Sequence, residues 1–214
     1  MNNLSKNFII NVGRQFGSGG KEISEKLAHR LGISFYDKEL IALASKESGL
    51  CPEIFENADE KASQGVALGM RFQFISDGCI PYNNYLSNDA LFKIQSDVIR
   101  GLSEEKSCLF LGRCADYILR DNLRCINLFI SSPMHVRVDR IVKKCQLTPQ
   151  KAEEFIEKSD KMRASYYNYY SFKKWGMAST YHFCIDSSLL GIDGTVNFLY
   201  ELIQARLKNE TVFK

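Results

Sequence analysis

The chain of 214 residues is 45% hydrophobic and 25% charged, a composition typical of globular domains that excludes a long disordered or fibrous protein. Its formal net charge of +3 is too small to predict nucleic acid or a membrane as the main partner. The seven cysteines include no C-x-x-C pair, and the polar N-terminus leads into only a short apolar run, so we expect no disulfide framework, no zinc site and no export. These features predict a single cytoplasmic domain over residues 1–214.

The first part of the chain alternates short apolar runs with helical patterns. Residues 8–12 predict a buried strand, and apolar residues at helical spacing predict a helix over 21–31 that ends at Gly32. Residues 33–36 and 38–46 predict a second strand and a second helix. From about 48 to 88, glycines and a proline interrupt apolar residues that follow no sustained period. We expect a variable insertion with some helix there.

Regular patterns return at Asn88, which is a plausible N-cap for a helix. Ser132 is a plausible N-cap for a second helix, which begins at Pro133, and Thr148 precedes a proline that opens a third. The predicted helices are 88–104, a short one ending at 119, 133–145, 149 to about 170, and 195–208, and the predicted strands are 108–111, 125–130 and 181–185. Strands that alternate with helices predict an α/β fold with a mainly parallel sheet covered on both faces.

The segment between the first strand and the first helix is rich in glycine. Such a turn lets successive backbone N–H groups converge, and the helix N-terminus adds partial positive charge, so the segment predicts a phosphate-binding loop. The usual loop, G-x-x-x-x-G-K-[ST], carries a lysine for the phosphates. Here Gly20 stands at the lysine position, and Lys21 and Glu22 follow. A turn that only packs strand against helix is the alternative.

The order of several short motifs resembles the cytidylate kinase-like family, divergent relatives of the P-loop nucleoside monophosphate kinases. The segments that carry this resemblance are 13–23 (GRQFGSGGKEI), 35–41 (FYDKELI), 110–113 (FLGR), 128–141, 160–163 (DKMR) and 184–188 (CIDSS). Together they span nearly the whole chain, and the irregular loop is shared with the family. One departure is Cys114, which stands where cytidylate kinases have an aspartate.

The resemblance implies a P-loop NTPase fold of the nucleoside monophosphate kinase type, with a helical lid over about 134–172. It also implies ATP as phosphoryl donor, Mg²⁺, and a small acceptor such as a nucleoside monophosphate. The expected catalytic residues are Lys21, Arg137, Arg140 and Arg163. The expected nucleotide-binding residues are Gly13, Arg14, Gln15, Gly17, Ser18, Gly19, Gly20, Lys21 and Glu22. The expected acceptor-binding residues are Asp37, Arg113, Asp160 and Arg163.

Physical arguments support some of these roles and leave alternatives open. Arg137 and Arg140 share one helical face and could reach the γ-phosphate, or they could form a solvated basic face. Arg163 could contact phosphate or only pair with Asp160, three residues earlier. Glu22 could bind Mg²⁺ through water or only favour the helix N-terminus.

The aromatic residues 166–170, with Phe172 and Trp175, could stack on a base, although aromatics on such a helix usually pack. For the whole chain, the alternative to a kinase is a nucleotide-binding regulatory protein without efficient transfer. Gly20 and Cys114 favour that alternative. A structural protein that binds no nucleotide is the third interpretation. Lys21, whose long side chain can span a one-residue offset, is the expected counterpart of the usual loop lysine.

Overall fold

The computed structural model describes residues 7–37 and 85–209. The predicted helix 38–46 and nearly all of the predicted insertion 48–88 lie outside these residues. The elements are β1 (Ile9–Arg14), α1 (Gly20–Leu31), β2 (Ser34–Tyr36), α5 (Tyr85–Glu105), β3 (Cys108–Leu111), α6 (Ala115–Ile118), β4 (Cys125–Ser131), α7 (Met134–Cys145), α8 (Pro149–Ser171), a 3-10 turn (Ala178–Thr180), β5 (Phe183–Asp186) and α9 (Gly191–Lys208). Strands and helices alternate through most of the described chain, as predicted.

The five strands form one sheet in the order β2-β3-β1-β4-β5. All four pairings are parallel, with Ile9 opposite both Cys108 and Cys125 in the first register positions. The prediction of a mainly parallel sheet is confirmed. Because the strands are parallel, their carboxyl ends share one edge of the sheet, where open α/β folds bind ligands.

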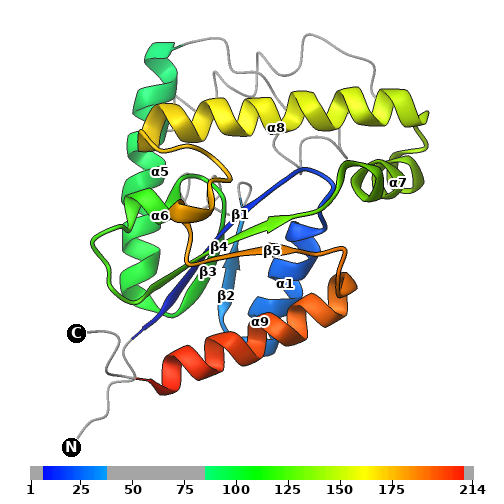
Figure 1. Ribbon diagram of the computed structural model, residues 1–214. Helices are drawn as coiled ribbons and strands as arrows, with labels where there is room; N and C mark the ends of the chain where they lie inside the picture. Colours follow the sequence, from blue (N-terminus) through cyan, green and yellow to red (C-terminus); the bar gives the residue numbers. More distant parts are fainter. Residues whose placement is uncertain (1–6, 38–84, 210–214) are drawn as a thin grey trace, which may run out of the picture.

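The strands β1, β3 and β4 are buried for most of their length, with alternate residues facing helices on opposite sides of the sheet, whereas β5 at the edge is mostly exposed. One face packs on α1 and α9 through a core that includes Ile10, Val12 and Leu128. The opposite face packs on α5 and α6 through a core that includes Ile9 and Phe110. Figure 1 shows α1 and α9 below the sheet, with α5, α6 and α8 on the other side.

The helices α7 and α8 occupy the range predicted as a lid. Arg137 and Ile141 are the buried residues of α7, and a small separate core joins α7, α8 and Phe16 of the loop after β1. The side chain of Thr148 caps α8 by accepting a hydrogen bond from the backbone N–H of Lys151, which confirms that predicted helix start. The loop after β1 therefore packs directly against this helical pair.

Three predicted helix starts were wrong. Asn88 lies inside α5, which begins at Tyr85. Ser132 does not cap α7, whose N-cap is Pro133 without any side-chain cap hydrogen bond, and the Ser132 N–H donates to the side chain of Gln15. α9 begins at Gly191, before the predicted residue 195, and the Thr195 hydroxyl donates to the Gly191 carbonyl within the first turn. Two glycines in that turn weaken the helical pattern in the sequence.

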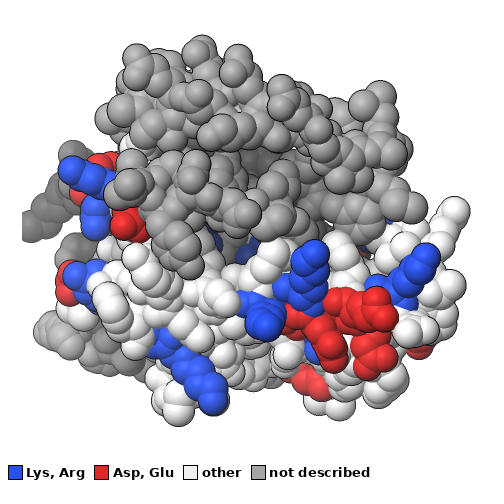
Figure 2. All heavy atoms as spheres, turned by 90° about the horizontal axis from the view of Figure 1, so that it is seen from above, with Lys and Arg blue, Asp and Glu red and all other residues white. Residues whose placement is uncertain are grey.

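The surface of the described part is mixed in charge. In the view from above, the largest group of acidic side chains has basic side chains beside it, and other acidic and basic side chains lie elsewhere on this face (Figure 2). None of the helices in the described ranges combines the length and the apolar character that crossing a membrane requires.

Candidate active site

The glycine-rich loop joins β1 to α1 at the carboxyl edge of the sheet. Gly17 and Gly19 adopt left-handed backbone conformations, with φ of 77° and 78°, which a residue with a side chain adopts only under strain. No side chain caps the N-terminus of α1. Among the described residues, the backbone N–H groups of Gly17 and Gly19 have no hydrogen-bond partner. The loop can thus offer N–H groups and a helix N-terminus to an anion.

Ser18 holds the loop together from the inside. Its side chain is fully buried, and its hydroxyl donates to the Gln15 carbonyl at 2.8 Å and accepts from the Gly20 N–H at 3.3 Å. The hydroxyl of Ser187, after β5, donates to the Ser18 carbonyl at 2.6 Å. Ser18 therefore shapes the loop through the contacts of its side chain, and its contact with nucleotide stays a prediction.

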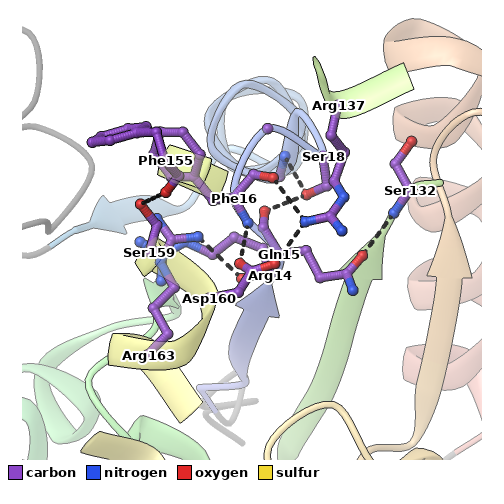
Figure 3. Close-up of polar contacts among 12 residues, drawn as sticks. Arg14, Gln15, Phe16, Ser18, Ser132, Arg137, Phe155, Ser159, Asp160 and Arg163 are labelled. Atoms are coloured by element: carbon purple, nitrogen blue, oxygen red, sulfur yellow. Dashed lines mark hydrogen bonds and ion pairs between the residues drawn. The ribbon is translucent and has the colours of Figure 1, made fainter. Parts of the chain in front are cut away.

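Gln15 ties the loop to the neighbouring strand. Its N–H donates to the Ile130 carbonyl at 3.0 Å, and its side-chain oxygen accepts from the Ser132 N–H at 3.1 Å. Figure 3 shows Gln15 reaching from the loop to the end of β4. Gln15 therefore contacts the scaffold at the end of β4, and its contact with nucleotide stays a prediction.

A partly buried ion pair joins the loop to α7 and α8. The Phe16 N–H donates to Asp160 at 2.7 Å, and the second oxygen of Asp160 lies 2.6 Å from the Arg137 guanidinium. The same guanidinium donates to the Phe16 carbonyl at 3.3 Å. The Phe16 ring is 2% exposed and meets Phe155 edge to face, with ring centroids 5.0 Å apart. Asp160 thus holds the Phe16 N–H directly and, through Arg137, the Phe16 carbonyl (Figure 3), and its contact with the acceptor stays a prediction.

The three arginines predicted around the lid all reach the loop. Arg137 donates to the Phe16 carbonyl, Arg140 to the Gly17 carbonyl at 3.0 Å, and Arg163 to the Arg14 carbonyl at 3.2 Å. These contacts are with loop backbone, and each one fixes the plane of one peptide. The solvated-face alternative is wrong for Arg137, which is 6% exposed.

Lys21 links the loop to the end of β2. Its ammonium lies 3.0 Å from the carboxylate of Asp37, whose side chain is 9% exposed. The resemblance assigned Lys21 to the donor and Asp37 to the acceptor, and the structure brings the two together. Glu22, in contrast, lies in the first turn of α1, 3.0 Å from Lys26 one turn later, and its role toward Mg²⁺ stays a prediction.

The turn after β3 is strained. Gly112, Arg113 and Cys114 follow one another with positive φ values of 81°, 60° and 55°, and such runs of non-glycine residues persist where the surroundings hold them. The Arg113 guanidinium lies over the Tyr166 ring, 5.5 Å from its centroid. Cys114 is 3% exposed, and burial raises the pKa of its thiol. It stays neutral where cytidylate kinases have a carboxylate.

A buried carboxyl group lies just beyond this turn. Asp116 accepts a hydrogen bond from the Tyr167 hydroxyl at 2.6 Å, and burial raises the pKa of Asp116 although this bond opposes the rise. The pair fixes α8 against α6. The sequence did not indicate Asp116, because only the fold brings it opposite an aromatic that is 51 residues away.

The aromatic residues of α8 pack on one another and on α5. Tyr170 stacks on Phe92 with centroids 4.0 Å apart, and Tyr166 meets Tyr170 at 4.8 Å. Trp175 meets Phe129 of β4 edge to face. These contacts favour the packing interpretation over base stacking for these rings. Phe172 differs, since it is 88% exposed.

In the described part, no three His, Cys, Asp or Glu side chains lie close enough together to hold a metal ion. Mg²⁺ is commonly held by phosphate oxygens, water and only one or two carboxylates. Asp37, at the end of β2, is one carboxylate at this edge of the sheet, and it is paired with Lys21. A Mg²⁺ site stays a prediction.

Known proteins resemble the chain in sequence and in structure. The model of the cytidylate kinase-like family matches residues 9–189. A crystal structure of an uncharacterized protein from Eubacterium ventriosum is 28% identical, with a TM-score of 0.68 over 92% of this chain and 99% of that chain. A protein from Thermus thermophilus is 15% identical, with a TM-score of 0.54 over 94% and 98%. Shikimate kinase from Acinetobacter baumannii is 16% identical, with a TM-score of 0.50 over 94% of both chains. No curated protein matches the sequence.

Proposed function

Because the chain belongs to the cytidylate kinase-like family and has a P-loop kinase fold, we propose that it transfers the γ-phosphoryl group of ATP to a small acceptor such as a nucleoside monophosphate. The family and the fold support the general class of this protein, a nucleotide or small-molecule kinase. The acceptor, ATP and Mg²⁺ belong to the proposal. We also propose that the chain forms a single domain in the cytoplasm and that α7 and α8 are its lid.

The observation that carries this proposal is the link between Lys21 and Asp37 at 3.0 Å. It connects the helix that follows the phosphate loop to the end of β2, where the family's acceptor site begins. Phosphoryl transfer needs donor and acceptor held in line, with positive charge between them. A lysine anchored at this junction can neutralise the phosphoryl group as it moves, while the carboxylate orients the acceptor.

The other side chains have supporting roles in this scheme. Gly17 and Gly19 offer N–H groups to the donor phosphates, and Arg113 lies at the acceptor side of the sheet edge. Arg137, Arg140 and Arg163 fix the loop backbone in the structure described, and we propose that Arg140 or Arg163 exchanges a carbonyl for a phosphate oxygen on binding. When bound, Mg²⁺ supplies charge neutralisation on the phosphates.

A panel of acceptors tests the proposal. Purified protein is incubated with ATP and Mg²⁺ and with each nucleoside monophosphate in turn, with shikimate as an acceptor of different chemistry, and ADP release is measured. The proposal requires acceptor-dependent ADP release. Release that is the same with and without every acceptor contradicts transfer and leaves only hydrolysis.

A second function is supported by two observations at the same site. Gly20 offers no side chain at the usual lysine position, and Cys114 is a buried neutral thiol. Both fit a protein that binds nucleotide as a regulatory signal and transfers phosphate poorly. ATP that raises the melting temperature without any ADP release supports this regulatory function. The absence of any thermal shift favours a structural protein.

A further inference from the structure

The loop has a glycine where other P-loops have their lysine, and a neighbouring side chain explains why. A Cβ atom built on Gly20 would lie 2.6 Å from Cβ and 3.0 Å from Cγ of Arg14. Real Cβ atoms do not approach other carbon atoms so closely. The φ of Gly20 does not lie in the left-handed region. Space, and not backbone conformation, thus excludes a side chain at position 20.

A second glycine makes room for the far end of the same side chain. A Cβ built on Gly112, in the turn after β3, would collide with Nη1 of Arg14. The Arg14 side chain therefore starts against the first residue of α1 and ends over the backbone of the β3–α6 turn. At its base, Arg163 of α8 donates to the Arg14 carbonyl at 3.2 Å, as Figure 3 shows among the contacts around the loop.

The Arg14 side chain runs along the edge of the sheet, from the proposed donor site at the end of β1 toward the proposed acceptor site at the ends of β3 and β2. β3 lies between β1 and β2, so a side chain that runs from the end of β1 to the end of β3 points toward Arg113 and the Lys21–Asp37 pair. Lys21 is already held at the end of β2, 3.0 Å from Asp37. The stem of Arg14, its Cβ and Cγ, fills the space beside Gly20, and its guanidinium lies farther along the edge, over Gly112.

We propose that Arg14 takes the place of the usual loop lysine and binds the β- and γ-phosphates of the donor at the point where donor and acceptor meet. The inference rests on the proposed function, because it assigns a role within that nucleotide site. A guanidinium suits the task, since its planar fork can bind two phosphate oxygens at once and stays charged at any pH of interest. Lys21 then serves the acceptor side of the transfer.

The test moves the charge from position 14 to position 20. Four proteins are compared with the parent: Arg14→Gln, Arg14→Gly, Gly20→Lys, and the double variant Arg14→Gly/Gly20→Lys. Arg14→Gly removes the Cβ that blocks position 20, so a lysine fits there only in the double variant. Arg100→Ala, in an exposed ion pair with Asp97 on α5, is the matched control for loss of an arginine. Each protein is assayed for melting temperature, for ATP and AMP affinity by calorimetry, and for ADP release.

We expect Arg14→Gln to weaken ATP binding by roughly 10- to 100-fold, the scale of one hydrogen bond to a charged group, and AMP binding much less, because AMP lacks the β- and γ-phosphates. Turnover should fall by about 100- to 1000-fold, the loss seen when one preorganised charge donor is removed. The double variant should bind ATP more tightly than Arg14→Gly and than Gly20→Lys. Arg100→Ala should match the parent in all assays.

The inference is overturned if Arg14→Gln binds ATP and turns over as the parent does, and the proposed function then stands without it. It is also overturned if ATP and AMP affinities fall equally together with the melting temperature, because Arg14 is then structural. A double variant no better than Arg14→Gly speaks against it as well. If the parent binds no nucleotide, the proposed function fails first, and this inference fails with it.

Discussion

The ion pair of Asp160 and Arg137 is the interaction whose removal should affect the loop most. Arg137 is buried, Asp160 keeps a 16% exposed side chain, and the two are 2.6 Å apart. Replacing Asp160 by Ala leaves a buried guanidinium without its carboxylate and the Phe16 N–H without its acceptor. Breaking a buried pair from one side costs about 3 to 5 kcal/mol. Because Asp160 is partly exposed, we expect the lower end, about 3 kcal/mol of unfolding free energy.

For a chain of this length, 1 kcal/mol corresponds to about 2 to 4 °C in melting temperature. Asp160→Ala should therefore melt about 6 to 12 °C below the parent. Asp160→Asn keeps an oxygen for the Phe16 N–H and loses only the charge, so its loss should be smaller. Asp97→Ala removes one partner of the exposed pair with Arg100, 2.9 Å away, and should cost at most about 1 kcal/mol.

Urea unfolding followed by circular dichroism gives the free energy of unfolding for the parent and the three variants. ATP affinity per folded molecule is then measured below the melting temperature. We expect Asp160→Ala to lose affinity as well as stability, because the Phe16 peptide is no longer held. If Asp160→Ala is as stable as Asp97→Ala, the pair behaves as a surface ion pair and the loop does not depend on it.

Three further predictions concern single side chains. Lys21→Ala should reduce turnover more than ATP affinity, because charge on Lys21 is needed most while the phosphoryl group moves, and steady-state kinetics with unchanged turnover would refute its catalytic role. Arg163→Ala should weaken nucleotide binding while lowering unfolding free energy by at most about 1 kcal/mol; a variant that unfolds readily but binds normally when folded makes Arg163 structural. His182 accepts the Asn127 N–H at 2.9 Å through Nδ1, and burial lowers its pKa from 6.5, with Arg206 adding to the effect. Its contribution to stability should be complete above pH 6.5 and decline as the pH falls through 6.5 and the lowered folded-state pKa, so urea unfolding from pH 8 to 5 should show a weaker pH dependence in His182→Gln.

The sequence alone determined the order of strands and helices and the place of the phosphate loop. Those features depend on local patterns: short apolar runs form strands, helical spacing forms helices, and glycines permit the backbone that the loop needs. The family motifs also marked Asp37 and Arg113 at the correct edge of the sheet. The alternation of strands and helices predicts that the sheet is parallel, but it does not predict the order of the strands within the sheet.

The tertiary structure decided what each polar side chain contacts. Asp160 lies 144 residues from the Phe16 N–H that it accepts, and no periodicity in the sequence connects the two. Lys21 turned to Asp37 because the end of β2 lies beside the start of α1. The role of Gly20 became clear only with Arg14 in place, because the space that one side chain leaves for another depends on the path of both backbones. Local patterns thus set the elements, and packing between distant elements set the chemistry of the loop.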